Sequence, residues 1–301
     1  MNQELVVISR KKGHKSSKVT LNIYRIICYA VLLVMVFLCL FPFYIMLVNC
    51  TRANSDIQKS FTLWFGTNLS NNLRNLFKNK NYPIASATLN SAWLALVCAT
   101  LTVYFSALTA YATHIYSFKG KKIVTTFIIA IMMIPTQVST LGLILMLYDI
   151  QAKTGIRLMD TFVPLVLPSI CAPITYFYLK QYMDSVLPTE VIEAARVDGS
   201  SEFGIFHKMV LPMIKPALAV QFIFAFVNSW NNYFLPSMIL SSKSNYTLPI
   251  LIASLKASDP STFDFGQIYC LMTIAVLPLI IVYFIFSKSI IKGLTSGAVK
   301  G

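Results

Sequence analysis

The chain has 301 residues, of which 56% are hydrophobic and only 12% are charged, and its mean hydropathy is +0.67. So few charged side chains cannot solvate a globule of this length, which excludes a soluble enzyme or binding domain and predicts a membrane protein. The net charge of +14 fits basic segments beside anionic lipid headgroups. No nucleic-acid-binding motif accompanies this charge, so we expect no nucleic-acid partner.

Six apolar runs are long enough to cross the hydrocarbon core of a bilayer, which is about 30 Å thick and takes roughly 17–25 helical residues. None of the runs contains Asp, Glu, Lys or Arg. Proton-coupled carriers usually place such side chains at depth, so their absence argues against an ion-coupled carrier that works alone. The sequence predicts an all-α membrane protein with six transmembrane helices, at residues 26–49, 86–113, 123–148, 161–179, 217–240 and 267–287.

The distribution of Lys and Arg among the connecting segments predicts the orientation of the chain. With a cytoplasmic N-terminus, the inner segments hold most of the 25 basic residues. We therefore expect both termini in the cytoplasm. The expected parts are a basic N-terminal segment at residues 1–25, a six-helix transmembrane domain at 26–291 and a C-terminal tail at 292–301.

Uncharged polar side chains lie within the third and fifth runs, each set beside a proline that is expected to bend its helix. Amides and hydroxyls offer hydrogen bonds without charge and aromatic rings offer flat faces, which suits a neutral polyhydroxylated solute. The alternative is that these side chains join neighbouring helices. In a continuous fifth helix, Pro236 would leave the carbonyl of Asn232 without its donor. The candidate translocation-path residues are Gln137, Asn228, Trp230, Asn231 and Asn232.

The inner loop between the fourth and fifth runs, residues 184–215, is predicted to form a charged helical elbow. Thr189 can cap a first helix, and Gly199 can end it because glycine accepts a positive φ. Ser200 or Ser201 can begin a second helix, which a proline stops. Helical spacing puts four residues of the first helix on one face, made shallow by its alanines: Val191, Ala194, Ala195 and Asp198. The same spacing puts three residues of the second helix on one side: Phe203, Phe206 and Val210.

The elbow sequence EAARVDGSSEFGIFHKMVLP, residues 193–212, resembles the EAA loop of permease subunits in binding-protein-dependent ABC importers. The residues that carry the resemblance are Glu193, Ala194, Ala195, Gly199, Leu211 and Pro212. Met209 stands where that pattern has isoleucine. The stretch WNNYFLP, residues 230–236, is similar to a segment of sugar permeases, and the C-terminal tail is similar to that of the maltose-type second permease. The resemblance covers nearly the whole chain.

The resemblance implies a type I ABC importer permease fold in the bacterial cytoplasmic membrane. Such a permease forms half of the translocation path for a carbohydrate, here expected to be an oligosaccharide, and couples to an ATPase through the EAA loop. It is not itself an enzyme and carries no cofactor, because the ATPase binds the ATP. The implied partners are a second homologous permease in a heterodimer, an ATPase dimer, an extracytoplasmic sugar-binding protein and membrane lipid.

The resemblance also assigns roles to two sets of residues. The ATPase-coupling residues would be Glu193, Ala194, Ala195, Asp198, Gly199, Phe203, Leu211 and Pro212. The outer loop at 255–266 would contact the binding protein through Ser258, Asp259 and Ser261. No metal site is expected, because the cysteines and histidines are scattered without the spacing of ligands.

Two other kinds of function remain as alternatives. The same machine could carry another small solute, such as a polyol or glycerol phosphate, although a phosphate ester favours Arg or Lys in the path. A less favoured alternative is an ion-coupled secondary carrier, because the runs lack ionisable side chains. An intramembrane enzyme is disfavoured, since neither an HExxH motif nor paired acids at depth occur.

Overall fold

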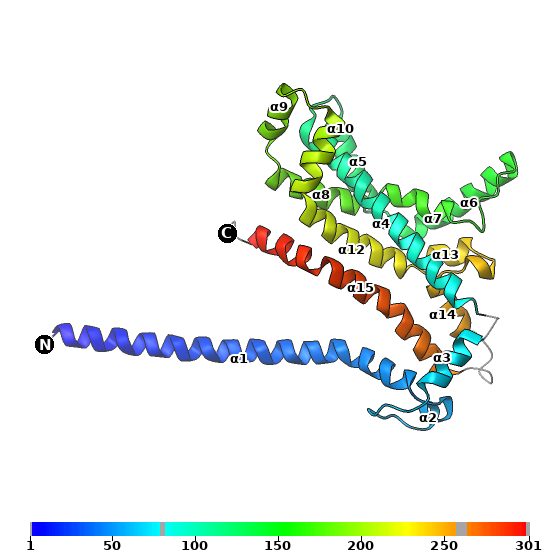
Figure 1. The fold of residues 1–301 in the computed structure, drawn as a ribbon. Coiled ribbons are helices and arrows are strands. Elements are labelled where there is room, and N and C mark those ends of the chain that lie inside the picture. The colour runs from blue at the N-terminus through cyan, green and yellow to red at the C-terminus, as the bar shows by residue number, and fades with distance from the viewer. Residues whose placement is uncertain (1, 79–81, 257–263, 299–301) are drawn as a thin grey trace. The chain divides into compact units, whose positions relative to one another are not determined.

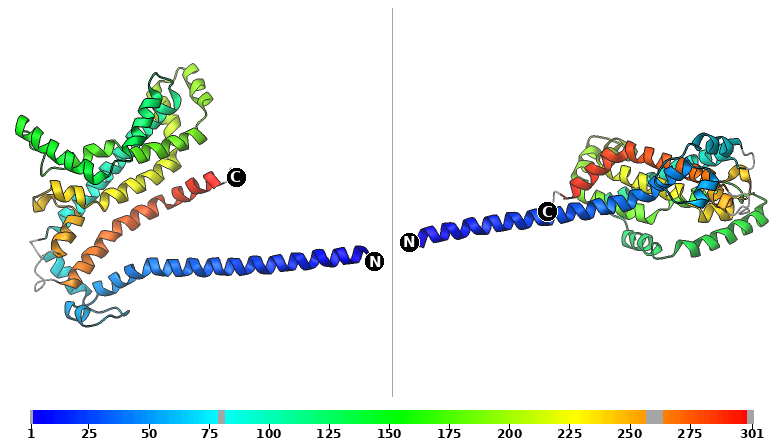
Figure 2. Two further views of the ribbon diagram at one scale, coloured as in Figure 1. Left: turned by 180° about the vertical axis from the view of Figure 1, so that it is seen from behind. Right: turned by 90° about the horizontal axis from the view of Figure 1, so that it is seen from below.

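The computed structural model describes residues 2–78, 82–256 and 264–298, and all regular secondary structure in these ranges is helical. The chain divides into two compact units, Met1–Leu73 with Asp264–Cys270, and Arg74–Phe263 with Leu271–Gly301. The helices of each unit can be followed in Figures 1 and 2. In chain order they are α1 (Asn2–Cys50), α2 (Asn54–Lys59), α3 (Leu69–Lys78), α4 (Ile84–Ile115), α5 (Lys121–Ile131), α6 (Thr136–Thr154), α7 (Val163–Val166), η1 (Leu167–Ile170), α8 (Pro173–Val186), α9 (Thr189–Val197), α10 (Glu202–Ile205), η2 (Phe206–Val210), α11 (Leu211–Met213), α12 (Lys215–Trp230), α13 (Phe234–Ile239), η3 (Lys243–Asn245), α14 (Leu248–Lys256) and α15 (Phe265–Ala298).

The first unit joins the end of α1 to α2, the start of α3 and the first turns of α15. Buried Asn72 on α3 donates its side-chain amide to the carbonyl oxygens of Cys50 and Arg52, at 2.9 and 2.8 Å. Gly266 of α15 packs directly on this junction, where a Cβ would lie 2.6 Å from the Asn72 amide nitrogen. Glycine is therefore needed at this position for the helices to approach so closely.

The second unit is organised around α4, which packs against α12 and α8. The buried side of α4 is lined with small residues at helical spacing, among them Ala95, Ala99, Ala107 and Ala110, all with no exposed surface. Small side chains let neighbouring helices approach closely, which is how helices associate within a membrane. The small side chains of this run thus explain why α4 can pack closely against both α12 and α8.

Four described helices are long and apolar enough to cross a membrane, and they coincide with four of the six predicted spans: Asn22–Cys50, Ile84–Ile115, Val163–Val186 and Phe265–Ser287. A fifth candidate is the pair Glu202–Met213 and Lys215–Trp230, which is bent by 82°. The all-α membrane fold is thereby confirmed. The count of six transmembrane helices and the cytoplasmic placement of the termini stay predictions.

The third and fifth predicted spans are each broken into two helices. Pro135 stands directly before α6 and lacks the N–H that would continue a helix, which explains the break between α5 and α6. In the fifth span α12 already ends at Trp230, and α13 begins at Phe234. The expectation of a continuous helix through Asn232 and Pro236 was therefore wrong. Interrupted backbone at membrane depth is stable only where protein or water satisfies its polar groups.

Asp160, between α6 and α7, fixes the chain that follows α13. It has a positive φ of 62°, and its amide donates to the carbonyl of Ile239 at 2.9 Å. Its carboxylate accepts the backbone amides of Ser241 and Ser242 at 2.9 Å and the hydroxyl of Ser242. The hydrogen bonds from the Ser242 hydroxyl and amide hold the pKa of Asp160 well below its usual range. The buried carboxylate therefore stays charged and holds these two segments together.

Candidate functional site

The first helix of the elbow, α9, begins directly after Pro188. Pro188 has an extended backbone and occupies the N-cap position, and no side chain caps the helix there, so the prediction of a Thr189 cap was wrong. The predicted end of the helix is confirmed. Gly199 has a φ of +81°, and its amide donates to the carbonyl of Arg196 at 3.0 Å. A residue in the left-handed region past the last turn is the usual way for a helix to end.

The two alanines of α9 point in different directions. Ile192 and Ala195 are buried in a core cluster that includes Phe206, whereas Glu193 and Ala194 are exposed. The prediction that both alanines share one exposed face was therefore wrong. Ile192, three residues before Ala195, is the large apolar residue that directs this side of α9 into the core.

Apolar side chains are exposed on both sides of the turn at Gly199. Val197 is 88% exposed and Phe203 is 70% exposed. Sequence reasoning missed Val197, although an apolar residue that lies off the buried stripe, just before a helix break, is a signal that could have found it. Asp198 is exposed beside it. We call five exposed residues the outer edge of the elbow: Glu193, Ala194, Val197, Asp198 and Phe203.

Ser201 is the N-cap of the second helix of the elbow, α10, and it is one of the two residues that were predicted to begin this helix. The hydroxyl of Ser201 accepts the amide of Gly204 at 3.2 Å. Phe206 and Val210 are buried while Phe203 is exposed, so the predicted shared side was wrong. The turn Phe206–Val210 is π-helical, with more residues per turn than an α-helix, and this shifts the register of the buried stripe.

The last turn of the elbow, α11, leads into the fifth predicted span. Leu211 is half-buried against the core cluster, and Pro212 is exposed. Ile214 is fully buried at the point where the chain bends by 82° into α12. The residues of the predicted Leu-Pro pair thus stand at the corner between the elbow and α12.

Two charged residues of the elbow form an ion pair across the turn at Gly199. The Nε atom of Arg196 donates to Glu202 Oε1 at 2.6 Å, and the guanidinium lies 5.4 Å above the ring of Tyr116. Glu202 Oε2 accepts the hydroxyl of Tyr116, the residue that follows α4, at 2.5 Å and the hydroxyl of Tyr111, in the last turns of α4, at 3.2 Å. We call these four residues the clasp: Arg196, Glu202, Tyr111 and Tyr116. It closes the elbow and ties it to α4.

The charges of the clasp are set by its hydrogen bonds. The hydrogen bond from Arg196, followed by that from Tyr116, lowers the pKa of Glu202 from 4.5 to about 2. Burial, followed by the bond to Glu202, raises the pKa of Tyr116. At neutral pH the carboxylate is therefore charged and the phenol keeps its proton, so the bond persists. Sequence reasoning missed the clasp, since its tyrosines lie far away in the chain; the opposite charges that flank Gly199 are the only local signal.

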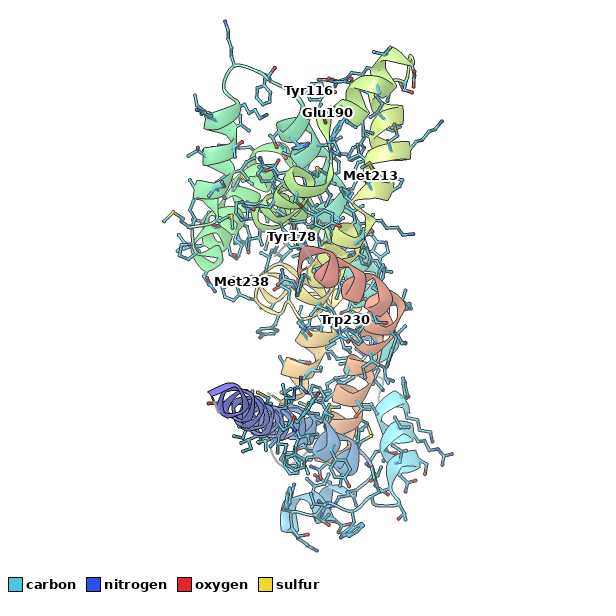
Figure 3. The ribbon with its side chains drawn as sticks, turned by 90° about the vertical axis from the view of Figure 1, so that its left-hand side faces the viewer. Tyr116, Tyr178, Glu190, Met213, Trp230 and Met238 are labelled. Carbon is cyan, nitrogen blue, oxygen red and sulfur yellow. The ribbon has the colours of Figure 1, made fainter. Side chains whose placement is uncertain are left out.

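A buried core beneath the elbow joins α4, α8, α9, η2 and α12. Its members include Tyr176, Met183, Ile205 and Ala217. Close-packed interiors transmit displacement rather than absorb it. The elbow is thus packed against these helices through one continuous core. Figure 3 shows Tyr116 and Glu190 at one end of the second unit, and Trp230 well away from them.

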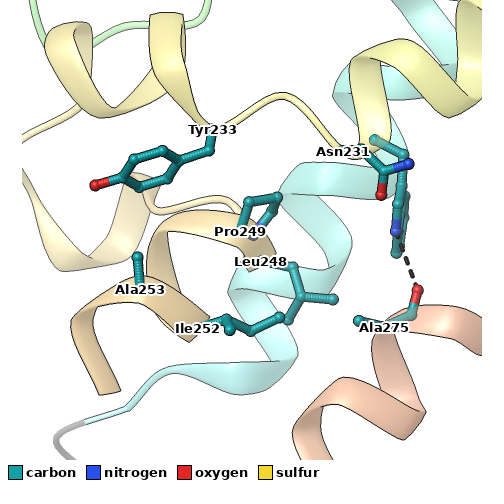
Figure 4. Close-up of a pocket in the computed structure, with 8 residues that line it drawn as sticks. Asn231, Tyr233, Leu248, Pro249, Ile252, Ala253 and Ala275 are labelled. Atoms are coloured by element: carbon teal, nitrogen blue, oxygen red, sulfur yellow. Dashed lines mark hydrogen bonds between the residues drawn. The ribbon is translucent and has the colours of Figure 1, made fainter. Parts of the chain in front are cut away.

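The candidate translocation-path residues of the fifth span lie around the break after α12. Asn228 and Asn231 are exposed and Asn232 is half-buried. Trp230 is only 2% exposed; its indole N–H donates to the carbonyl of Ala275 on α15 at 3.1 Å (Figure 4). The ring of Trp230 is thus a fixed wall, while the asparagines keep their amides accessible.

A small cavity of about 280 Å³ opens beside this break. Trp230, Asn231 and Tyr233 line one part of it, and α14 contributes apolar side chains such as Ile252 (Figure 4). A mostly apolar wall with one amide can hold a small neutral group, but it offers nothing to balance a charge. Gln137 is exposed in the first turn of α6, on another helix. The predicted binding-protein contacts Ser258, Asp259 and Ser261 lie outside the described residues.

Comparison with solved structures identifies the class of protein that this fold defines. A chain of a bacterial ABC transporter involved in the import of the acidic polysaccharide alginate matches with a TM-score of 0.76 and 17% identity. The match covers 89% of this chain and 96% of that chain. The chain therefore has the fold of an ABC importer permease.

Sequence comparisons place the chain within that class. The family model of the binding-protein-dependent transport system inner membrane component matches residues 103–296. The arabinooligosaccharides transport system permease protein AraQ of Bacillus subtilis is 32% identical, over 93% of this chain and 97% of that protein. The lactose transport system permease protein LacG of Rhizobium radiobacter is 30% identical, over 91% and 96%. The sn-glycerol-3-phosphate transport system permease protein UgpE of Pectobacterium atrosepticum is 29% identical, over 89% and 95%.

The chain therefore belongs to the family of binding-protein-dependent transport system inner membrane components. It is a multi-pass protein of the bacterial inner membrane and a transporter subunit, not an enzyme. The resemblance that the elbow sequence indicated is thus confirmed. The roles of individual residues in coupling and in the translocation path stay predictions.

Proposed function

We propose that this permease forms half of the translocation path for a neutral oligosaccharide, beside a second permease of the same family. Two relatives that match over more than nine tenths of the chain are named for arabinooligosaccharide and lactose transport. The predicted spans contain no ionisable side chain. An uncharged cargo needs none, because amides and backbone carbonyls can bind sugar hydroxyls.

The elbow docks on the ATPase partner, which binds the ATP. The observation that carries this proposal is the outer edge, where Val197 and Phe203 expose apolar surface beside Glu193 and Ala194. Ala194 allows close approach, and Glu193 can pair with a basic group of the ATPase. Exposed apolar side chains on a rigid, charged projection are typical of a protein docking site.

Nucleotide-driven closure of the ATPase dimer would then move the elbow as a rigid body. The clasp keeps α9 and α10 in one arrangement, and the core beneath them joins the elbow to α4, α8 and α12. A displacement of the elbow is thereby passed to these helices, as alternating access requires. The outer loop at 255–266 would contact the extracytoplasmic binding protein, through Ser258, Asp259 and Ser261.

Glycerol phosphate is the second candidate cargo, because a relative that is 29% identical is named for its transport. A phosphate ester needs positive charges or many donors along its path. The exposed amides of Asn228 and Asn231 supply donors but no charge. A neutral sugar is therefore the better match to the side chains of this half of the path.

The proposal can be tested with the complete transporter in proteoliposomes. ATPase activity is measured with the binding protein alone, with the binding protein and a neutral oligosaccharide, and with the binding protein and glycerol 3-phosphate. We expect stimulation and uptake with the oligosaccharide only. Stimulation by glycerol 3-phosphate alone would assign the chain to phosphate-ester transport, and stimulation by neither would exclude both cargoes.

A further inference from the structure

The loop after α2 exposes several aromatic side chains. We call residues 60–66 the aromatic finger. Trp64 is 81% exposed, Phe61 is 71% exposed and Phe65 is 59% exposed. An exposed cluster of large rings is costly in water and usually marks a surface that contacts a partner or a membrane.

Both ends of the aromatic finger are fixed to the end of α1. The buried guanidinium of Arg52 donates to the carbonyl oxygens of Asp56 and Ser60, at 2.6 and 2.9 Å. At the other end, the amide of Gly66 donates to Thr51 Oγ1 at 2.8 Å. A Cβ at Gly66 would lie 2.5 Å from the carbonyl oxygen of Thr51, so only glycine allows this contact. The rings are therefore presented by a held loop, not by a loose chain.

The middle of the aromatic finger folds back along α1. The hydroxyl of Tyr44 donates to the carbonyl of Leu63 at 2.6 Å, and its ring meets the ring of Phe65 edge to face at 5.8 Å. Tyr44 lies six residues before Cys50, the last residue of α1. At a rise of 1.5 Å per residue, the finger returns about 9 Å along the helix toward the membrane.

The level of this contact can be compared with the thickness of a bilayer. The predicted apolar run at residues 26–49 has its midpoint between residues 37 and 38, six to seven residues before Tyr44. This places Tyr44 about 10 Å from the midpoint, inside the roughly 15 Å half-thickness of the hydrocarbon core, and Cys50 at the end of α1 about 19 Å from it, outside that core. The aromatic finger therefore lies level with the boundary between the acyl chains and the headgroups.

We propose that the aromatic finger inserts into the headgroup–acyl boundary of the phospholipid bilayer and anchors the end of α1. Tryptophan and other aromatic rings favour this boundary, because the ring is apolar while its N–H and the neighbouring backbone can reach water. Leu40 and Phe43, which precede Tyr44 on α1, are also exposed apolar side chains. Lys59, directly before the finger, is exposed and can reach a lipid phosphate.

Tryptophan fluorescence tests this placement in the assembled transporter. The chain has three tryptophans. Because Trp230 is buried, Trp93→Phe leaves Trp64 as the exposed emitter, and Trp64→Phe in the same background gives the baseline. Emission is recorded in phosphatidylcholine vesicles whose acyl chains carry bromine close to the headgroup or close to the terminal methyl. We expect the shallow bromine to remove most of the Trp64 emission and the deep bromine to remove less.

Equal quenching of the Trp93→Phe variant and its baseline would overturn the proposal. So would quenching of Trp64 that appears only when the binding protein is left out, because the finger would then be a protein contact. Tyr44→Phe provides a second measurement, since it removes the hydrogen bond that holds the finger against α1. We expect its Trp64 emission to lose the difference between shallow and deep quenching. An unchanged difference would contradict the role of Tyr44.

Discussion

Replacing Gly199 by alanine tests the backbone conformation of the elbow without changing its side-chain contacts. Gly199 has a φ of +81°, and a Cβ added there would meet no atom within 4 Å. The substitution therefore adds no steric clash and acts only through the left-handed backbone, which costs an alanine roughly 1–2 kcal/mol. A penalty of this size shifts a local opening equilibrium by a factor of roughly 5–30. We expect the turn to open and the clasp residues on either side of it to separate.

A matched control is available in the same chain. Gly155 ends α6 with a φ of +72°, and it too has open space where a Cβ would lie. Gly155→Ala therefore carries the same backbone penalty at a position outside the elbow. The assay compares sugar uptake and binding-protein-stimulated ATPase activity of both variants in proteoliposomes, after membrane insertion and ATPase assembly have been verified.

We expect Gly199→Ala to lose most of its uptake and stimulation, and Gly155→Ala to keep both. Unchanged uptake and stimulation in both variants would show that the conformation of the turn does not matter for coupling. Equal loss in both would show that the effect is a general loss of stability. Either outcome would refute the reasoning that the left-handed backbone at Gly199 controls coupling.

Four further substitutions test the outer edge, the clasp and the path. Glu193→Lys should weaken docking to the ATPase by about tenfold or more through charge reversal, with insertion intact, measured by co-purification and uptake. Glu202→Gln should lower stimulation less than Gly199→Ala does, since the uncharged amide can still accept from tyrosine. Because the Glu202 pKa is lowered from 4.5 to about 2, the stabilisation is complete above the ordinary carboxyl range and is lost only as pH falls toward 2. Protease resistance of the wild-type elbow should therefore be constant around neutral pH, and that of Glu202→Gln should be lower throughout. Asn232→Leu should slow uptake with ATPase assembly unchanged, and so should Asn228→Leu; normal uptake in both would assign these amides to packing.

The elbow was predictable because its signals are local. A glycine that must take a positive φ and a serine that caps the next helix are read from neighbouring residues, and Gly199 and Ser201 take these roles. The direction in which α9 faces was not predictable from the alanines alone. It depends on which side chain is buried in the core, and Ile192 is the one that is fully buried. The clasp depends on tyrosines about ninety residues away, whose approach only tertiary packing decides.

The composition predicted a membrane protein, but it did not predict where the helices within the spans are interrupted. Hydropathy treats residues 217–240 as one run, whereas the helix ends at Trp230. At that point the indole N–H of Trp230 bonds to α15, and the next residues leave the helix before any proline. Hydropathy measures how favourable it is to remove side chains from water. It therefore cannot show where contacts with a neighbouring helix stabilise an interruption of the helical backbone.

The helix α12 connects the two candidate sites. It has 16 residues, or about 24 Å, and its single proline, Pro216, lies in the first turn, so it can move as a rigid rod. One end follows buried Ile214 at the corner of the elbow, and the other is held to α15 through Trp230. Under the proposed function, a displacement of the elbow is carried along this rod without being absorbed. It then reaches the break at residues 231–233, between the end of α12 and the start of α13, where Asn231 and Asn232 lie.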